Sequence, residues 1–205
     1  MRKFVRLPEP AFLTGRWEKW GCEWEARRAR NSAAKFHWHE VDGEPVNLKL
    51  LPTLKRQTQE HCSFCDAFPV SPPSEDTIEH FRPKSQFPRE AFSWANLYFC
   101  CSHCQRKGNR FDEALLRPDA PDFDFDRYFR WDFTTGELKP IESADAARRS
   151  RAEVTIGIYH LNEGHPSLRK RELRKRSRDP SAPLDDFAYR QFVQEGESPD
   201  ESDAA

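Results

Sequence analysis

Residues 60–66 read Glu-His-Cys-Ser-Phe-Cys-Asp, and residues 100–106 read Cys-Cys-Ser-His-Cys-Gln-Arg. Each segment holds one Cys-x-x-Cys pair: Cys62 with Cys65, and Cys101 with Cys104. Two thiolates at this spacing in a turn bind one face of a tetrahedral Zn²⁺, and a second pair completes a closed structural site. The 35 residues between the pairs exceed the gap of a simple zinc ribbon, so the sequence predicts a zinc-braced core with a substantial insertion. The alternative is a set of buried thiols that bind no metal.

The insertion carries a second motif, Thr77-Ile78-Glu79-His80-Phe81-Arg82-Pro83-Lys84-Ser85. Neighbouring residues on a strand point to opposite faces, so Glu79 and His80 share a site only where the strand ends or bends, and Pro83 supplies such an end. A carboxylate that binds Mg²⁺ beside an imidazole that deprotonates water suits metal-assisted phosphodiester hydrolysis. The alternative is a surface glutamate next to a half-buried histidine.

The chain continues with Trp94-Ala95-Asn96-Leu97 before the second cysteine pair. The order Cys-x-x-Cys, Glu-His-x-x-Pro-x-Ser, Asn-Leu and Cys-x-x-Cys resembles the HNH endonucleases, whose core is a ββα-metal fold. More narrowly, these motifs and the later Tyr-Phe-Arg-Trp-Asp segment resemble the PtuB-like HNH subunit of Septu-type antiphage defence systems. Related proteins accompany some retrons. The resemblance covers residues 61–117 with a specific combined motif and extends more loosely to about Ser177.

The resemblance implies a role for each matching residue. His80 takes the place of the general base that activates the attacking water, and we expect it to be exposed to substrate rather than packed. Glu79 matches the first ligand of a catalytic Mg²⁺ or Mn²⁺, and Asn96 matches the asparagine that holds the loop and orients the histidine. The structural zinc site corresponds to Cys62, Cys65, Cys101 and Cys104.

Gln105 departs from the family pattern, because relatives usually place Asn or His directly after the last cysteine. Its side chain is one methylene longer than Asn, and its amide oxygen is a neutral ligand. We expect Gln105 to be the second protein ligand of the catalytic ion, with His103 and Asn109 as the alternatives.

Several basic residues surround these motifs. Such cations are expected to favour the approach of a phosphodiester and to stabilise the additional negative charge of its transition state. They are Arg82, Lys84, Arg106, Lys107 and Arg110. Each of them can equally be a solvated surface cation. Among the other histidines, His37 and His39 have no acids at ligand spacing, and His160 and His165 are interpreted as capping or surface residues.

The pattern along the chain predicts an α+β fold with mostly helical extensions, and the resemblance implies a small zinc-stabilised ββα-metal core embedded between them. We expect helices at 14–30, near 48–54 with an interruption at Pro52, and at 143–161, a hairpin at 128–140, and a basic segment at 169–178. The predicted divisions are a helical N-terminal extension (1–60), the nuclease core (61–117), a hairpin plus helical part (118–178) and an acidic, disordered tail (179–205).

Composition sets the broad class of the protein. The chain has 205 residues, of which 13% are aromatic, enough for a packed core, and a net charge of −1. Residues 179–205 carry eight acids against one base, a net charge of −7, which leaves +6 on residues 1–178 and suits a polyanionic partner. No apolar run approaches the roughly 20 residues that span a bilayer, and the N-terminus does not read as a signal peptide. We expect a soluble, cytoplasmic protein that does not bind membranes.

The combined interpretation is a metal-dependent HNH endonuclease that hydrolyses phosphodiester bonds of nucleic acid, with DNA favoured over RNA. The resemblance implies that it is the effector nuclease of a bacterial antiphage defence system and acts with an ATPase subunit (PtuA-like, of the SMC or OLD type). Two alternatives remain open: a zinc-stabilised nucleic-acid-binding or adaptor module without catalysis, and a purely structural zinc protein in a larger complex.

Overall fold

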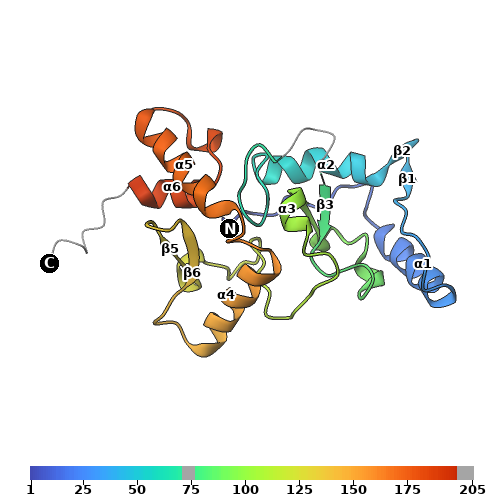
Figure 1. Cartoon of the computed structure of the whole chain (residues 1–205). Coiled ribbons are helices and arrows are strands. Elements are labelled where there is room, and N and C mark those ends of the chain that lie inside the picture. Colours follow the sequence, from blue (N-terminus) through green and yellow to red (C-terminus); the bar gives the residue numbers. More distant parts are fainter. Residues whose placement is uncertain (71–76, 198–205) are drawn as a thin grey trace.

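The computed structural model describes residues 1–70 and 77–197, and the fold is mixed α+β, as predicted (Figure 1). The helices are α1 (Trp17–Arg30), α2 (Val46–Gln57), α3 (Ser102–Gln105), α4 (Ala146–Ile158), α5 (His165–Arg178) and α6 (Arg190–Glu197). The strands are β1 (Glu40–Val41), β2 (Glu44–Pro45), β3 (Thr77–His80), β4 (Leu97–Cys100), β5 (Phe129–Asp132) and β6 (Glu137–Pro140). They pair as antiparallel hairpins, β1 with β2, β3 with β4 and β5 with β6.

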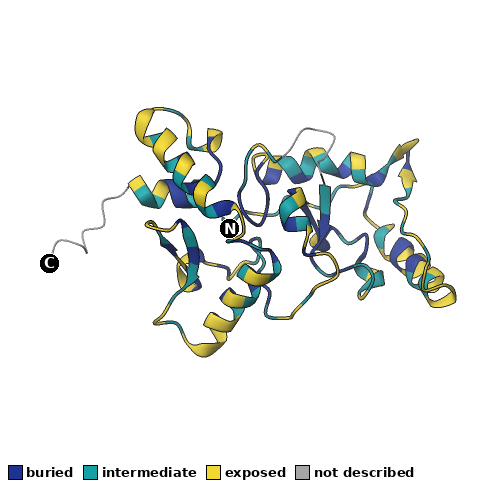
Figure 2. Ribbon diagram, viewed as in Figure 1, coloured by how far each residue is buried: buried dark blue, intermediate teal, exposed yellow. Residues whose placement is uncertain are grey.

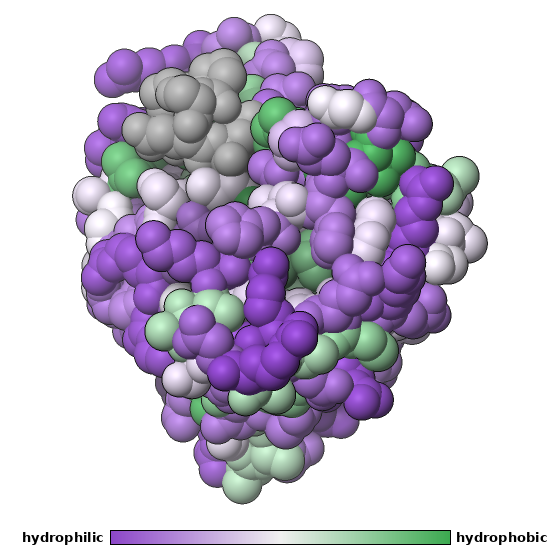
Figure 3. Space-filling model, turned by 90° about the vertical axis from the view of Figure 1, so that its right-hand side faces the viewer, coloured by the Kyte–Doolittle hydropathy of each residue, from purple (hydrophilic) through white to green (hydrophobic). Residues whose placement is uncertain are grey.

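The elements follow the chain from one end of the molecule to the other. In Figure 1, β3 and α3 lie in the middle, α1 and the β1–β2 hairpin lie at one end, and α4, α5, α6 and the β5–β6 hairpin lie at the other. The face at the α1 end is predominantly hydrophilic, with small scattered apolar patches (Figure 3). Within the described residues, no helix combines the length and the apolar character needed to cross a membrane.

Strand β4 separates two hydrophobic cores. Because successive side chains of a strand point to opposite faces, Leu97 and Phe99 pack into a core shared with α1 and α2, whereas Tyr98 and Cys100 pack into a core shared with β5, β6, α4 and α6. All four side chains are buried, and Figure 2 marks this central region as buried. The strand that pairs with β3 is therefore fixed from both sides.

Helix α1 packs closely against the short 3₁₀ helix η2 (Pro88–Glu90). Trp20 and Trp24 form its buried stripe. Gly21 lies between them, and a Cβ atom there would lie only 2.1 Å from the carbonyl oxygen of Arg89. The missing side chain allows the two backbones to touch, which fixes the segment around η2 in place.

Helix α2 differs from the prediction of a helix interrupted at Pro52. The helix runs without a break from Val46 to Gln57 and contains Pro52. Its buried positions, Val46, Leu50 and Leu54, recur at helical spacing on one face. Burial of this stripe outweighs the roughly 3 kcal/mol that an internal proline costs a helix.

The C-terminal half begins with the hairpin predicted at 128–140, which is formed by β5 and β6. Helix α4 follows and lies within the helix predicted at 143–161. The basic segment forms most of α5, but Arg169 is not a surface cation. Its guanidinium is buried and donates to the backbone carbonyls of Gly136, at 2.9 Å, and Leu161, at 2.6 Å. Arg169 therefore stabilises the packing of α5 against the hairpin.

The prediction of a disordered tail from residue 179 is wrong for the part that the structure describes. Helix α6 packs Phe192 and Val193 into the core, and Arg190 forms a buried ion pair with Asp66, with 2.7 Å between nitrogen and oxygen. The prediction of disorder rested on the acidic residues of this segment and did not take the apolar residues between them into account. The remaining tail residues, 198–205, lie outside the described residues.

Candidate functional site

The four cysteines of the two Cys-x-x-Cys pairs come together in one buried cluster. Their sulfur atoms all lie within 4.8 Å of one another. Cys65 Sγ and Cys101 Sγ are 3.6 Å apart, close to the roughly 3.8 Å between two sulfurs of a tetrahedral Zn²⁺ site with 2.3 Å bonds. Four thiols and this spacing fit a structural zinc ion.

Backbone amides donate hydrogen bonds to two of the cysteine sulfurs. Cys101 is the N-cap of α3, and its Sγ accepts a hydrogen bond from the amide of Cys104 at 3.4 Å. The amide of Cys101 in turn donates to Cys62 Sγ at 3.4 Å. Burial raises the pKa of the Cys104 thiol well above its usual value, so a bound divalent cation would have to supply the charge that keeps it a thiolate. The second pair thus anchors the start of α3 directly after β4.

A pocket of about 130 Å³ lies where β3, α3 and the loop after each of them meet. The polar residues that line it were all singled out in the sequence: Glu79, His80, Lys84, Gln105 and Asn109. Strand β3 ends at His80, the position at which two neighbouring side chains can turn toward one site. The structure therefore brings together the predicted base, the predicted metal ligand and two of the three candidates for the second ligand.

His80 is held in one tautomer. Its Nε2 lies 2.9 Å from the carbonyl oxygen of Ala91, which can only accept, so Nε2 carries the proton and Nδ1 carries the lone pair. Within the described residues Nδ1 has no hydrogen-bond partner. Burial lowers the pKa of His80 to about 3, and the nearby charge of Lys84 contributes to this shift. The imidazole is therefore neutral in the folded chain and has a free acceptor nitrogen.

Two aromatic side chains enclose the His80 ring. Trp38 stacks on it at 5.6 Å between ring centroids, and Phe36 meets it edge-on at 5.6 Å. His80 is only 6% exposed, so the expectation that it is exposed rather than packed is wrong. Neither aromatic residue was predicted from the sequence to belong to the site, although two aromatics spaced two apart in Phe36-His37-Trp38 are typical of one face of an extended segment.

Glu79 forms a buried ion pair with Lys107. Lys107 Nζ lies 2.8 Å from Glu79 Oε1 and donates to the carbonyl oxygen of His80 at 3.0 Å. Burial raises the pKa of Glu79 to about 7, although the charge of Lys107 opposes this shift. Lys107 is 1% exposed and does not present its charge to solvent, so the alternative of a solvated surface cation does not hold for it. It lies three residues, about one helical turn, after Cys104, which is the signal that could have identified it as inward-facing.

Asn96 connects both ends of the loop that follows β3. Its Oδ1 accepts from the backbone amide of Arg82 at 2.7 Å, and its Nδ2 donates to the carbonyls of Arg82 and Glu90, each at 3.0 Å. The next residue after Glu90 is Ala91, whose carbonyl orients His80. Asn96 lies outside the pocket of Glu79 and His80, in a position to hold the loop.

The three candidates for the second ligand differ in position. Gln105 and Asn109 line the pocket, and Gln105 Nε2 makes only a long contact, 3.5 Å, to the carbonyl of Ile78. Asn109 Oδ1 accepts from Ser85 Oγ at 2.9 Å. His103 instead faces His165, with 4.4 Å between ring centroids, and does not line the pocket.

The remaining predicted cations do not gather around this pocket. Of the five, only Lys84 lines it, and burial lowers the pKa of that amine. Arg82 pairs with two glutamates on the rim of a different pocket, and Arg106 pairs with Glu163 at 3.1 Å. Arg110 contacts His160 and backbone carbonyls.

Two of the other histidines, His39 and His165, have packing roles. His39 stacks on Trp20 at 4.8 Å between centroids, and His37 is exposed. His165 is buried and its Nδ1 lies 3.0 Å from the Tyr189 hydroxyl, so its interpretation as a capping or surface residue is wrong. Ring contacts with Tyr189, just before α6, and with His103 explain the difference.

No protein-family model matches the chain, and no curated protein matches it either.

Proposed function

We propose that this chain is a metal-dependent HNH-type endonuclease that hydrolyses phosphodiester bonds in nucleic acid. The observation that carries the proposal is the 130 Å³ pocket in which an oriented neutral imidazole, a carboxylate and two side-chain amides meet beside a four-cysteine cluster. The order of elements, two antiparallel strands followed by a short helix, agrees with the ββα-metal core that the motifs resemble.

In this proposal His80 is the general base. Nδ1 accepts a proton from the attacking water while Nε2 stays bonded to the Ala91 carbonyl, so the ring keeps its orientation during the transfer. A pKa of about 3 makes the free imidazole a weak base. The negative charge of a phosphodiester bound in the pocket would raise this pKa and strengthen the base. Lys84 lies in the same pocket and would pair with that phosphate.

Glu79 and Gln105 are the residues that would hold a catalytic Mg²⁺ or Mn²⁺. One carboxylate and one amide oxygen are a sparse set, but Mg²⁺ commonly takes most of its ligands from water and substrate phosphate. When bound, the ion would polarise the scissile phosphate and stabilise the leaving oxygen. Lys107 already holds Glu79 Oε1, so Glu79 has its other oxygen, Oε2, for this role.

The buried Lys107–Glu79 pair favours one competing function. An ammonium group lies 2.8 Å from Glu79, the one carboxylate among the described residues that line the pocket, and partly satisfies the charge that a metal would satisfy. A zinc-stabilised nucleic-acid-binding module without catalysis would have the same architecture. Binding of nucleic acid without cleavage at any Mg²⁺ or Mn²⁺ concentration would favour it.

Cleavage of plasmid DNA and of a structured RNA, each with a Mg²⁺ and a Mn²⁺ titration, tests the proposal. The variant His80→Gln retains an N–H that can donate to the Ala91 carbonyl but lacks the basic nitrogen. We expect it to cut about 10² to 10⁴-fold more slowly, the usual contribution of a general base. His37→Gln, at an exposed histidine, is the matched control and should cut normally. Equal rates for His80→Gln and the native chain would overturn the assignment.

The ATPase partner and the antiphage role belong to the same proposal and rest on the resemblance alone. We propose that the chain docks on an SMC- or OLD-type ATPase encoded beside it and that docking regulates cleavage. Co-expression and size-exclusion chromatography, followed by cleavage assays with and without ATP, test this. A chain that elutes alone and cuts at the same rate in both preparations would contradict it.

A further inference from the structure

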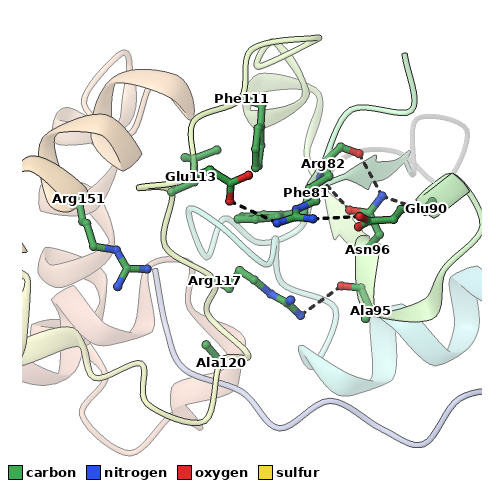
Figure 4. A pocket seen from close by; sticks show the side chains of 11 residues that line it. Phe81, Arg82, Glu90, Ala95, Asn96, Phe111, Glu113, Arg117, Ala120 and Arg151 are labelled. Atoms are coloured by element: carbon green, nitrogen blue, oxygen red, sulfur yellow. Dashed lines mark hydrogen bonds and ion pairs between the residues drawn. The ribbon is translucent and has the colours of Figure 1, made fainter. Parts of the chain in front are cut away.

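A second, larger pocket lies beside the candidate active site. It has a volume of about 360 Å³, within the range of about 300 to 1,000 Å³ that is usual for small-molecule sites (Figure 4). The segment after β3 contributes to both pockets: Glu79, His80 and Lys84 line the first, whereas Phe81 and Arg82 line the second. The opposite wall comes from Arg151 on α4, so this pocket joins the central hairpin to the C-terminal half.

The lining carries an excess of positive charge. Arg82 is balanced by ion pairs to Glu90 at 2.9 Å and Glu113 at 3.2 Å. Arg151 has no acidic partner among the described residues. It donates only to neutral oxygens, from Nε to the Ala114 carbonyl and from Nη1 to the Tyr128 hydroxyl, each at 3.2 Å.

A second arginine adds a free donor. Arg117 binds Asp119 at 3.0 Å, but that aspartate also pairs with Arg6 at 2.7 Å, so one carboxylate serves two guanidinium groups. Within the described residues, Arg117 Nη1 and Arg151 Nη2 have no hydrogen-bond partner. Arginine forks of this kind suit the oxygens of a phosphate group.

The remaining wall is aromatic. Phe111 is half-buried and meets Phe81 edge-on at 6.0 Å between ring centroids. Figure 4 shows the Phe111 and Phe81 side chains near Arg82, Arg117 next to Phe81, and Arg151 farther away across the pocket. The Arg117 guanidinium lies over the Phe81 ring, 5.7 Å from its centroid. Arginine donors beside aromatic rings are a combination that binds a phosphate together with a planar base.

We infer that this pocket binds one nucleotide, with its phosphate on Arg117 and Arg151 and its base against Phe111 and Phe81. The nucleotide can be free in solution, or it can be a residue of a nucleic-acid strand that passes through the neighbouring pocket. The inference concerns binding and does not require that the chain cleaves nucleic acid.

Calorimetric titration of the full-length chain, without added Mg²⁺ or Mn²⁺, tests the inference with four probes: AMP, UMP, inorganic phosphate and a single-stranded octanucleotide. Arg151→Gln should weaken nucleotide binding about ten-fold or more, since a hydrogen bond to a charged group is lost. Arg148→Gln is the matched control, an exposed arginine of the same helix that pairs with Asp145. Ala120→Leu fills the pocket and leaves every arginine in place, which separates loss of the site from loss of the fold.

Binding of AMP or UMP that is weakened in Arg151→Gln and Ala120→Leu, but not in Arg148→Gln, identifies a free nucleotide as the ligand. The same pattern with the octanucleotide alone identifies a nucleotide within a strand. Binding of inorganic phosphate as tight as that of the nucleotides would overturn the role of the aromatic wall. Absence of binding of all four probes, or equal binding by all variants, would overturn the inference altogether.

Discussion

At the scale of single residues, Lys107 has the largest influence on the candidate site. Its ammonium connects Glu79 to the carbonyl of His80, so one buried cation fixes the positions of both residues of the Glu-His motif. A sequence motif alone predicts which residues meet. It does not predict that a third residue neutralises one of them, because burial of a charged side chain depends on packing from elements distant in sequence.

Removal of this cation should destabilise the fold. Lys107→Met leaves Glu79 as an unpaired buried carboxyl, which costs about 3 to 5 kcal/mol when the remaining group stays charged. Because the pKa of Glu79 is already about 7, the group can take up a proton, and we expect a loss near the lower limit of this range. Urea unfolding at pH 7 measures the free energy.

The double variant Lys107→Met with Glu79→Gln is the control. It removes both charges, so it should recover most of the lost stability. Equal stability of the single variant and the native chain would contradict the assigned ion pair.

His165 should make stability depend on pH. Burial, together with the nearby charge of Arg169, lowers its pKa to about 3, whereas the unfolded chain has a histidine pKa of about 6.5. Between these values the unfolded state binds the additional proton, so the stability contributed by neutral His165 falls as the pH drops below 6.5. The stability difference between the native chain and His165→Gln should therefore shrink below pH 6.5, by at most about 1.4 kcal/mol per pH unit.

Urea unfolding of both chains at pH 7.5, 6.0 and 5.0 checks this prediction. Loss of metal at low pH affects both chains and cancels in the difference. The surface variant His37→Gln is the reference. A difference that stays constant over this range would show that His165 is not held neutral.

At the scale of elements, the sequence predicted the parts in which local pattern and burial agree. The β5–β6 hairpin alternates buried and outward residues, and α1 repeats its tryptophans at helical spacing. Prediction was wrong where long-range packing decided the outcome. Helix α2 continues through Pro52 because its apolar face is buried, and α6 forms because Arg190 reaches Asp66, 124 residues earlier in the chain.

The contact between α1 and η2 should be sensitive to one methyl group. Gly21→Ala places a Cβ 2.1 Å from the carbonyl oxygen of Arg89, which is backbone and cannot move aside cheaply. We expect a net loss of about 1 to 3 kcal/mol, in spite of the roughly 1 kcal/mol by which alanine favours a helix over glycine. Thermal unfolding measures the change.

Gly157→Ala in α4 is the matched control, since a Cβ there meets no atom within 4 Å. It should be neutral or stabilise by up to about 1 kcal/mol. Because Arg89 lies two residues before Ala91, whose carbonyl orients His80, Gly21→Ala should also reduce cleavage if the proposed function holds. Equal melting temperatures for the two alanine variants would exclude the close approach.

At the scale of the whole molecule, the predicted divisions at residues 60 and 117 do not separate independent units. The core that contains the four cysteines also contains Trp131 and Phe192, and the other core joins α1 and α2 to β4. The N-terminal extension contacts the site directly, because Trp24 Nε1 donates to the carbonyl of Lys84 at 2.9 Å. Charge and motif patterns indicate where the candidate site lies, but they do not reveal that segments far apart in sequence share one core.

This shared core determines what should follow if a zinc ion bound to the four cysteines is removed. The four cysteines lie in the same cluster as Tyr98 of β4 and Phe192 of α6, so loosening of the zinc site should spread to both the central hairpin and the C-terminal helix. Structural zinc contributes of order 10 kcal/mol in zinc-finger peptides, which is more than most domains can lose. We expect one zinc per chain by elemental analysis. Cys101→Ser should lower the melting temperature and expose amides of β3, β4 and α6 to hydrogen exchange together.

Cys22→Ser is the control for this experiment, since Cys22 is an exposed cysteine outside the cluster. It should retain the zinc, the melting temperature and the exchange protection of the native chain. Exchange confined to residues near α3 in Cys101→Ser would mean that the two cores unfold separately. Purified chain with well under one zinc and full stability would mean that the buried thiols hold the core by packing alone. A joint loss of protection would instead indicate that the metal, the pocket of His80 and the C-terminal helix form one cooperative unit.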